Sequence, residues 1–420
     1  MDRHQLLRGL ARETPTKIVL LVLDGVGGIR TAEQPATALE CAATPHLDRL
    51  AARSALGRIV PVGTGITPGS GPGHLALFGY DPLAPECDIG RGVLEALGLG
   101  LELREGTVAA RGNFATVDAD GNLTDRRAGR IPTEEGRRLC ALLRDALAAD
   151  PPPGLEVEVH PGEGYRFVLL LRADDGARLG AGLADSDPQV LGVPPLPLTA
   201  ENVTAENVTA ENDAAAETVR RLEPALATMR SALAGEERAN AFLLRGFSRR
   251  PDLPTFGELY RLRAGAFAGY PLYRGVASVC GMEVVECGKR VDDLIAAVTE
   301  RWADFEYLFL HVKQTDMAGE DGDLEAKARV LEEVDRALPR LLDLGPEVLA
   351  ITGDHSTPAP MRAHSWHAVP LLLHSPVCFV DPCERFDEVA ACVGALGTFP
   401  AAELMGLLLA NAGKLLKFGA

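Results

Sequence analysis

Three short apolar runs, each followed by polar residues, constrain the fold of this chain more than any other feature. They span Ile18–Leu23, Tyr307–Val312 and Val348–Thr352. Nearly continuous apolar runs that contain β-branched or aromatic residues are typical of strands buried in a parallel sheet. Asp24, Asp316 and Asp354 follow the three runs. Ligands of open α/β sheets collect beyond the carboxyl ends of the strands, so these aspartates are expected to share one site.

Helical patterns lie between the predicted strands. They cover 44–55, 291–302 and 324–342. This alternation of strand and helix predicts an α/β fold with a doubly wound sheet.

The middle of the chain has a different pattern. Strand-like runs occur at 107–111, 113–117, 155–159, 166–171 and 241–244, and helical patterns at 133–149 and 213–234. They predict an inserted α+β domain at 101–262, within a core formed by 1–100 and 263–420. A length of 420 residues fits two domains. The repeat within 199–212 is interpreted as an extended surface loop or helix start without a function.

Composition restricts the classes of function. The formal net charge of −17 argues against a nucleic-acid partner, because the sequence has no basic stripe to offset the repulsion. No apolar stretch is long enough for a bilayer and no signal peptide is evident, so a cytoplasmic protein without a membrane partner is expected. The eight cysteines form no Cys-x-x-Cys pair and are interpreted as reduced thiols.

A glycine-rich segment at 63–74 contains Ser70 and precedes the apolar residues 75–78. A serine on such a turn, just ahead of a helix, is positioned like an attacking hydroxyl. The alternative interpretation is a surface loop, because glycine and proline are frequent in ordinary loops.

Acidic and imidazole side chains suggest a metal centre. The candidate ligands are Asp24, Asp316, Glu320, Asp354, His355 and His364. Carboxylates gathered at strand ends repel one another, and a cation between them relieves that repulsion. Mixed oxygen and imidazole ligands suit Mn²⁺ or Zn²⁺, and Mg²⁺ is also compatible; two such ions would bracket a phosphoryl group. Each residue alone also fits an ordinary turn or a hydrogen-bonded loop histidine.

Several motifs resemble the alkaline phosphatase superfamily, namely 24–28, 44–48, the Ser70 turn with 75–82, and 353–356. More closely, the chain is similar to cofactor-independent phosphoglycerate mutases of the archaeal type. Segments 90–92, 111–116, 125–130, 185–188 and 244–246 also match that family, so the resemblance spans nearly the whole chain.

The resemblance implies an alkaline-phosphatase-like core, an inserted substrate domain and two divalent metal ions. From the mixed ligands, Mn²⁺ is the expected ion. The resemblance implies that one ion binds Asp24, Ser70, Asp354 and His355, and the other Asp316, Glu320 and His364. Ser70 would take the phosphoryl group of 3-phosphoglycerate and return it to the 2-hydroxyl of the retained glycerate. No bisphosphoglycerate would be needed, and the small phosphorylated substrate would be an intermediate of glycolysis and gluconeogenesis.

Arginines cluster in the family-like stretches of the insert. They are Arg111, Arg126, Arg127, Arg130, Arg166 and Arg245. Guanidinium groups bind phosphate and carboxylate through paired hydrogen bonds, so these residues are candidates for substrate binding. Surface salt bridges are the alternative for each of them.

The sequence departs from the family pattern at a few positions. Glu320 stands where the family usually has histidine, which changes the expected metal preference. Gly71, His46 and His367 also replace the usual residues, and Lys313 is a candidate for the lysine that related enzymes place near the phosphate.

Two other functions use the same motifs. One is a metal-dependent phosphohydrolase or phosphotransferase acting on another small phosphorylated acid. The other is a metal-binding protein without turnover. The arginine-rich insert favours the mutase over a simple hydrolase, because transfer without loss to water requires an enclosed acceptor. Retention of Ser70 argues against a protein without turnover.

Overall fold

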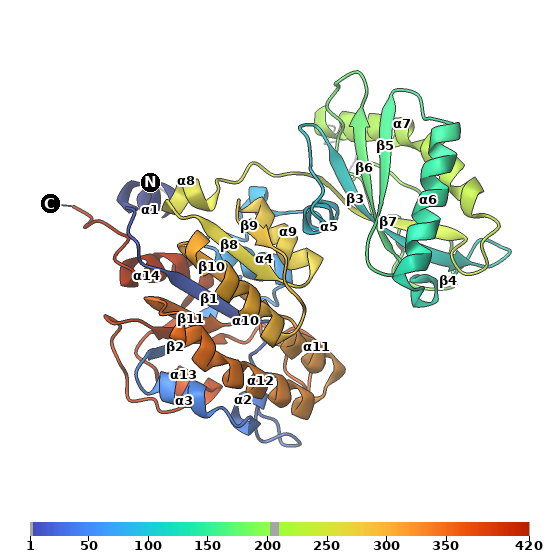
Figure 1. Ribbon diagram of the computed structural model, residues 1–420. Helices are drawn as coiled ribbons and strands as arrows, with labels where there is room; N and C mark the ends of the chain where they lie inside the picture. The colour runs from blue at the N-terminus through green and yellow to red at the C-terminus, as the bar shows by residue number, and fades with distance from the viewer. Residues whose placement is uncertain (1–2, 202–209, 420) are drawn as a thin grey trace. The chain divides into compact units, whose positions relative to one another are not determined.

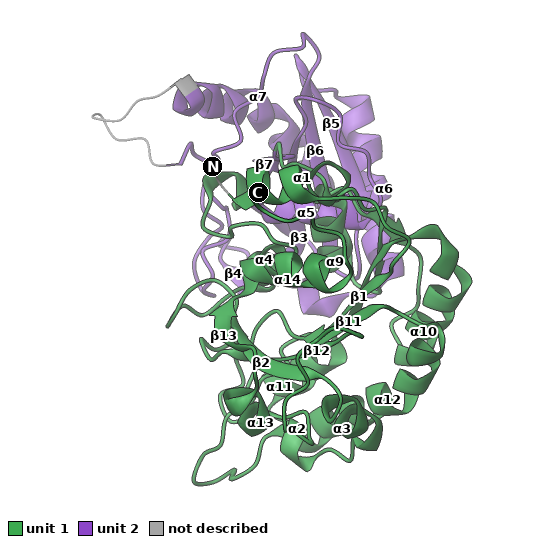
Figure 2. Cartoon of the chain, turned by 90° about the vertical axis from the view of Figure 1, so that its left-hand side faces the viewer, with its two compact units in different colours: residues 1–88, 252–420 green, residues 89–251 purple. Residues whose placement is uncertain are grey.

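The computed structural model describes residues 3–201 and 210–419 and divides the chain into two compact units (Figures 1 and 2). Residues 1–88 and 252–420 form the first unit and residues 89–251 the second. The division differs from the expected boundaries at 100/101 and 262/263, because α5 (Arg91–Gly98) packs with the second unit and α8 (Phe256–Tyr260) with the first.

Close packing explains where these two helices lie. A Cβ added to Gly92 would come within 2.2 Å of the carbonyl oxygen of Ala109, so α5 lies directly on a strand of the second unit. In α8, the Tyr260 hydroxyl donates to the carbonyl of Phe78 at 3.0 Å, within the first unit.

An eight-stranded sheet forms the centre of the first unit. Its order is β13 (Gly397–Pro400), β2 (Ala55–Val60), β12 (Val369–His374), β11 (Val348–Thr352), β1 (Ile18–Leu23), β10 (Tyr307–Val312), β8 (Ala264–Ala268) and β9 (Glu283–Val285). The three strands expected from the sequence, β1, β10 and β11, have the expected bounds. They are neighbours, with β1 parallel to both of the others. Their carboxyl ends therefore lie at one edge of the sheet.

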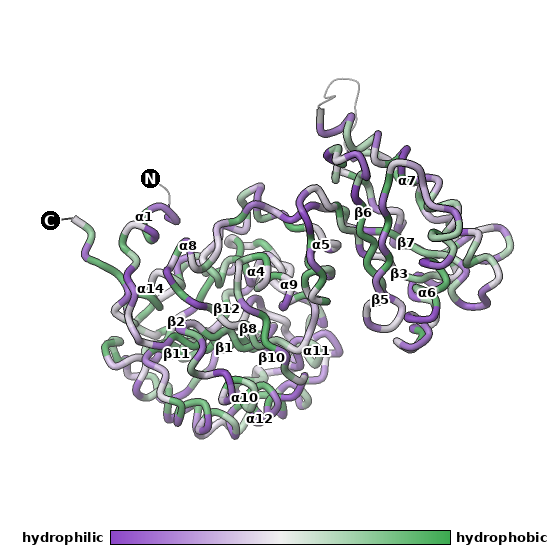
Figure 3. The backbone as a smooth tube through the Cα atoms, turned by 45° about the horizontal axis from the view of Figure 1, so that its top comes forward, coloured by the Kyte–Doolittle hydropathy of each residue, from purple (hydrophilic) through white to green (hydrophobic). Residues whose placement is uncertain are grey.

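The apolar character of these strands matches their position. Every residue of β1, β10 and β11 is buried, and the middle of the sheet is hydrophobic (Figure 3). The sequence pattern did not predict β2, β8, β9, β12 and β13. Of these, β12 pairs antiparallel with β11 and β2, so the sheet is mixed at that side.

Helices cover both faces of the sheet, which confirms the doubly wound α/β core. Helices α2 (Ala38–Cys41), α3 (Pro45–Ala51), α10 (Val291–Glu300) and α12 (Leu324–Asp343) lie on one side, and α4 (Ser70–Leu77), α9 (Pro271–Val279) and α14 (Leu404–Asn411) on the other (Figure 2). The remaining helices of this unit are α1 (Arg3–Leu10), α11 (Gln314–Asp321), α13 (Glu388–Val393) and the 3₁₀ turns Pro85–Cys87, Trp302–Asp304 and Ala401–Glu403.

The second unit is α+β, as expected. Its antiparallel sheet has the order β4 (Leu123–Asp125), β3 (Val108–Val117), β6 (Arg166–Ala173) and β5 (Leu155–Pro161), and β7 (Ala241–Arg249) also pairs with β3. Helices α6 (Thr133–Ala149) and α7 (Ala210–Leu233) and a 3₁₀ turn at Ala128–Arg130 complete it. An apolar core that includes Leu139 and Phe167 fills the space between sheet and helices.

Two details of the second unit differ from the expectation. The runs 107–111 and 113–117 form one strand, β3, in which Gly112 pairs with Phe167 of β6. The ring of Phe167 occupies the space where a side chain at position 112 would lie, so the glycine between the runs fits within the strand. Most of the repeat within 199–212 falls in 202–209, outside the described residues.

Among residues 3–201 and 210–419, none of the helices has the length and apolar character needed to cross a lipid bilayer.

Candidate metal centre

The candidate ligands gather at the carboxyl edge of the sheet in the first unit. Asp24 directly follows β1, Asp316 lies in the first turn of α11 after β10, and Asp354 and His355 follow β11. His364 lies in the loop that leads to β12. The adjacent, parallel pairing of β10, β1 and β11 therefore brings together side chains that are far apart in sequence.

The first compact group consists of Asp24, Asp354 and His355, all with fully buried side chains. His355 Nε2 lies 3.3 Å from Asp24 Oδ1 and 3.3 Å from Asp354 Oδ2. These two carboxylate oxygens are buried and have no hydrogen-bond partner among the described residues. Two unsatisfied anionic oxygens beside an imidazole nitrogen fit a divalent cation, which would offset the cost of burying them.

Ser70 lies beside this group. It is the first residue of α4, directly after Gly69, and its Oγ is 3.4 Å from His355 Nε2. The approach of α4 depends on Gly73, because a Cβ there would lie 2.4 Å from the carbonyl oxygen of Asp354. The structure thus brings Ser70 to the ligands with which the sequence grouped it.

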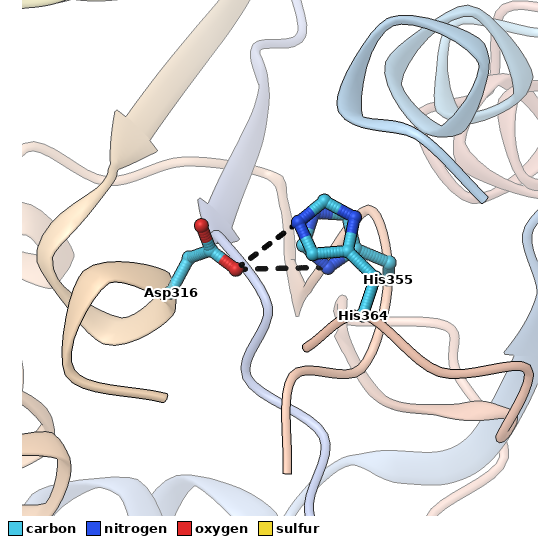
Figure 4. Close-up of side chains that lie close together, drawn as sticks. All are labelled: Asp316, His355 and His364. Carbon is cyan, nitrogen blue, oxygen red and sulfur yellow. Dashed lines mark ion pairs between the residues drawn. The ribbon is translucent and has the colours of Figure 1, made fainter. Parts of the chain in front are cut away.

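The second compact group consists of Asp316, His355 and His364 (Figure 4). Asp316 Oδ1 is 3.6 Å from His364 Nε2 and 3.9 Å from His355 Nδ1. The two imidazole rings stack with centroids 3.6 Å apart. His355 therefore presents a different ring nitrogen to each group, whereas the sequence analysis placed it in the first group alone.

A backbone carbonyl orients the His364 ring. Its Nδ1 is 3.0 Å from the carbonyl oxygen of Pro68, which only accepts, so Nδ1 carries the proton. The lone pair is then on Nε2, the atom that faces Asp316. A second partner on the far nitrogen is typical of metal-binding histidines.

Glu320 lies at the edge of the second group. Its Oε1 is 3.8 Å from His364 Nε2, but its side chain is 54% exposed and it is not part of the compact set of three. The structure places it near its expected partners, in a more open position than the buried Asp316.

Several buried groups that were not predicted from the sequence surround the carboxylates. His311 Nε2 donates to Asp24 Oδ2 at 2.9 Å, and His74 Nδ1 lies 3.2 Å from Asp354 Oδ2. The Tyr273 ring stacks on His311 with centroids 3.7 Å apart. A histidine within the otherwise apolar strand β10 was the one available signal for His311.

Lys313, a candidate by sequence proximity alone, lies between two of the aspartates. Its Nζ is 3.3 Å from Asp24 Oδ2 and forms an ion pair with Asp316. These carboxylates raise the pKa of Lys313, although burial opposes the shift.

The charges keep the first-group carboxylates ionised. Burial alone would raise the pKa of Asp24, but the hydrogen bond from His311 and the charges of Lys313 and His355 hold it well below the ordinary value. The pKa of Asp354 is also lowered, because His355 and His74 outweigh burial and the repulsion from Asp24. Both groups are therefore carboxylates at neutral pH, as cation binding requires.

The second unit holds a cluster of arginines on its sheet. Arg111 and Arg245 are paired opposite each other on β3 and β7, and Arg166 lies on β6. The Nε atoms of Arg111 and Arg166 are buried and have no hydrogen-bond partner within the described residues. Burial, together with the charges of Arg166 and Arg91, lowers the pKa of Arg111 to about 10, against the opposing charge of Glu95. Guanidinium groups whose buried Nε atoms are unpaired fit an anionic ligand.

The other candidate arginines differ in their surroundings. Arg126 donates two hydrogen bonds of 2.7 Å to Asp187, which also lies 3.3 Å from Arg245. Arg127 and Arg130 are exposed at a turn. Arg91 of α5, which the sequence analysis did not include, interacts electrostatically with Arg166 and Arg245. The structure therefore brings together Arg111, Arg166 and Arg245, adds Arg91, and links Arg126 through Asp187.

The similarity to known proteins extends over the whole chain. The family model of 2,3-bisphosphoglycerate-independent phosphoglycerate mutase matches residues 51–235. A Thermus thermophilus protein named probable 2,3-bisphosphoglycerate-independent phosphoglycerate mutase is 49% identical over 427 aligned residues, which cover 100% of both chains. The chain belongs to this family. A relative with the same name from Deinococcus radiodurans is 45% identical, again over 100% of both chains.

Solved structures agree with this family assignment. A protein from Pyrococcus horikoshii has a TM-score of 0.79 and 27% identity, covering 97% of this chain and 100% of its own. The cofactor-independent phosphoglycerate mutase from Thermoplasma acidophilum has a TM-score of 0.68 and 26% identity, covering 95% of this chain and 100% of its own. The resemblance inferred from sequence motifs is thereby confirmed.

Proposed function

We propose that this protein interconverts 3-phosphoglycerate and 2-phosphoglycerate without bisphosphoglycerate, as an isomerase of glycolysis and gluconeogenesis. The observation that carries the proposal is the position of Ser70. Its hydroxyl stands at the start of α4, 3.4 Å from His355, beside carboxylate oxygens that lack partners within the described chain. Full-length relatives named as this enzyme supply the substrate class.

The residues present fit two divalent metal ions. Asp24, Asp354, His355 and Ser70 would hold one, and Asp316 and His364 the other, with Glu320 at the edge of the second site. Bound ions of this kind would lower the pKa of the serine hydroxyl and offset charge on the phosphoryl oxygens. Among such ions we propose Mn²⁺, because the ligand sets mix carboxylates with imidazoles.

The proposed transfer has two balanced steps. The Ser70 oxygen attacks the phosphorus of 3-phosphoglycerate, a bond forms to Ser70, and the bond to the 3-oxygen of glycerate breaks. The 2-hydroxyl oxygen of the same glycerate then attacks the phosphoserine, and Ser70 is released. In the first step Ser70 loses its hydroxyl proton and the 3-oxygen gains one; in the second step the 2-hydroxyl loses a proton and Ser70 regains one.

We assign substrate binding to arginines of the second unit. Arg111 and Arg166 have unpaired buried nitrogens, which suit the phosphate or carboxylate of phosphoglycerate. Arg245 is proposed as a third contact. Arg126, Arg127 and Arg130 remain candidates on the family resemblance.

The location we propose is the cytoplasm. All eight cysteines are free thiols, and four of them are buried. Free thiols are usual in proteins of a reducing compartment, where this pathway operates.

One product assay separates the possible activities. Purified protein with Mn²⁺ and 3-phosphoglycerate, free of bisphosphoglycerate, is expected to produce 2-phosphoglycerate, observed by ³¹P NMR. A chelator should abolish the conversion and added Mn²⁺ should restore it. Release of inorganic phosphate in place of the isomer would indicate a hydrolase. Failure to form either product with any divalent ion would indicate a protein without turnover.

A further inference from the structure

A buried lysine lies behind the metal centre without a carboxylate partner. Lys327 of α12 is 1% exposed, and in the part of the chain that the structure describes the carboxylates of Glu388, Asp316 and Asp24 act on it through their charge without forming an ion pair. The Nζ donates instead to carbonyl oxygens, 2.7 Å to Gly25 and 2.8 Å to Thr357, with Gly27 at 3.4 Å. Removing a charge from water without an ionic partner is costly, so these hydrogen bonds must supply most of the compensation.

The carbonyl groups that bind Lys327 belong to the two loops that carry the ligands. Gly25 directly follows Asp24 at the end of β1, and Thr357 lies two residues after His355 at the end of β11. The ammonium group of Lys327 therefore contacts the loops that follow both strands.

Thr357 connects this ammonium group to the ligands themselves. Its hydroxyl donates to Asp316 Oδ1 at 2.5 Å and lies 3.0 Å from His355 Nδ1. The same residue thus has its backbone held by Lys327 and its side chain between two members of the second group. A displacement of Thr357 would change the positions of Asp316 and His355 together.

The far end of the first loop is held separately. Glu388 of α13 accepts from the backbone N–H of Gly28 at 2.7 Å and from the Thr37 hydroxyl at 2.6 Å. With Glu388 fixing Gly28, the segment between Asp24 and Gly27 has charged contacts to Lys327 and to Asp354, whose Oδ1 accepts from the Gly25 N–H at 3.3 Å. A neutral apolar side chain at position 327 would remove this donor from three carbonyl groups, of which that of Gly25 would keep the backbone N–H of Thr357 at 3.0 Å.

We propose that Lys327 is a positioning residue, which holds the loops after β1 and β11 together so that Asp24 and His355 converge on one cation and Asp316 stays in place to bind the other. The inference rests on the proposed metal-dependent function. It concerns affinity for the metal, and it assigns Lys327 no contact with substrate.

Calorimetric titration of the full-length protein with Mn²⁺, without substrate, tests the proposal. Lys327→Met is expected to lower Mn²⁺ affinity by about tenfold or more, as loss of residues that orient ligands typically does. The matched control is Lys414→Met. Lys414 is also 1% exposed, and its Nζ donates to the carbonyl of Thr14, away from the candidate ligands. Its replacement should lower the melting temperature but leave Mn²⁺ affinity unchanged.

A second variant covers the case in which Lys327→Met does not fold. Thr357→Val keeps the shape of the side chain and removes the hydroxyl between Asp316 and His355, so it should also weaken Mn²⁺ binding by about tenfold. Unchanged affinity in a folded Lys327→Met protein, or in Thr357→Val if Lys327→Met fails to fold, would overturn the proposal. Equal loss of affinity in Lys414→Met would overturn it as well, because the effect would then follow from general destabilisation.

The titration separates this inference from the proposed function. A wild-type protein that binds Mn²⁺ but does not convert phosphoglycerate would contradict the mutase, and the role of Lys327 would still be decided by the variants. A fully active wild type whose Lys327→Met variant binds Mn²⁺ normally would contradict the role of Lys327 alone. A wild type that binds no divalent metal would contradict both.

Discussion

Gly25 offers the sharpest mutational test of the packing at the metal centre. Its φ of +63° lies in the left-handed region, and an added Cβ would be 2.4 Å from Thr357 Oγ1 and 2.7 Å from Asp316 Oδ1. Gly25→Ala thus combines two penalties. The left-handed backbone costs an L-residue roughly 1–2 kcal/mol. Overpacking a well-packed buried site typically costs about 1–3 kcal/mol more.

A second glycine isolates the backbone contribution. Gly345, between α12 and β11, has a φ of +72°, and no heavy atom lies within 4 Å of where its Cβ would be. Gly345→Ala should therefore lower the free energy of unfolding by the backbone cost alone, roughly 1–2 kcal/mol. The free energies of unfolding of the two variants should therefore differ by about 1–3 kcal/mol, which is the cost of overpacking at Gly25.

Urea unfolding of both variants without metal measures this difference in unfolding free energy. Calorimetric titration with Mn²⁺ then measures its consequence, since the added methyl group displaces Thr357 or Asp316. We expect weaker Mn²⁺ binding for Gly25→Ala and normal binding for Gly345→Ala. Equal stability of the two variants, together with normal Mn²⁺ affinity of Gly25→Ala, would refute the close packing of Gly25 against the ligands.

Other perturbations test the ligands, the arginines and a remote carboxylate. Asp316→Asn should weaken Mn²⁺ binding at the second group by about 100-fold, as measured by calorimetry. Glu320→Gln should weaken it by about tenfold or less, because the side chain of Glu320 is half exposed. Arg111→Met should raise the KM for 3-phosphoglycerate by about tenfold or more, and Arg126→Met by less, because Arg126 is already bound to Asp187. Burial alone would raise the pKa of Asp381, but hydrogen bonds from three backbone N–H groups outweigh burial and lower it. The ionised carboxylate therefore stabilises the fold at pH values above the pKa of the unfolded state. This stabilisation is lost as the pH falls through the pKa of the folded state. Asp381→Asn should cost about 2 kcal/mol at neutral pH in urea unfolding, and a difference that persists well below pH ~4 would contradict this reasoning.

The central strands and the convergence of the ligands were predictable from sequence. A run such as Ile18–Leu23, apolar at every position, has no polar face and must be buried on both sides. Because such strands run parallel, the aspartates that follow them share an edge. The outer strands were not predictable in this way. β9 and β13 are short and partly exposed, so they lack the apolar pattern.

The surroundings of the site were harder to predict, because they depend on tertiary contacts. His311 and Lys327 each belong to a regular element; the one local signal for His311 was a histidine within an apolar strand, and nothing local distinguishes Lys327 from a surface lysine. Only the pairing of β10 with β1 brings His311 to Asp24. Similarly, the sequence of α12 is compatible with an exposed lysine at position 327, and only the packing of this helix in the folded protein buries it.

The surroundings of the arginines were equally hard to predict from the sequence. Arg111 and Arg126 are equivalent by residue type and motif, but one lacks a partner for a buried nitrogen and the other is held by Asp187. Arg91 was overlooked because α5 was assigned to the core, whereas it packs on the sheet of the second unit.

Phosphorylation of Ser70 tests the central claim most directly. Wild-type protein mixed with 3-phosphoglycerate and Mn²⁺, then quenched in acid, is expected to carry phosphate on the peptide that contains Ser70, as detected by mass spectrometry. Ser70→Ala should carry none and should form no 2-phosphoglycerate, while still folding and binding metal. Formation of 2-phosphoglycerate by Ser70→Ala at the wild-type rate would contradict the account.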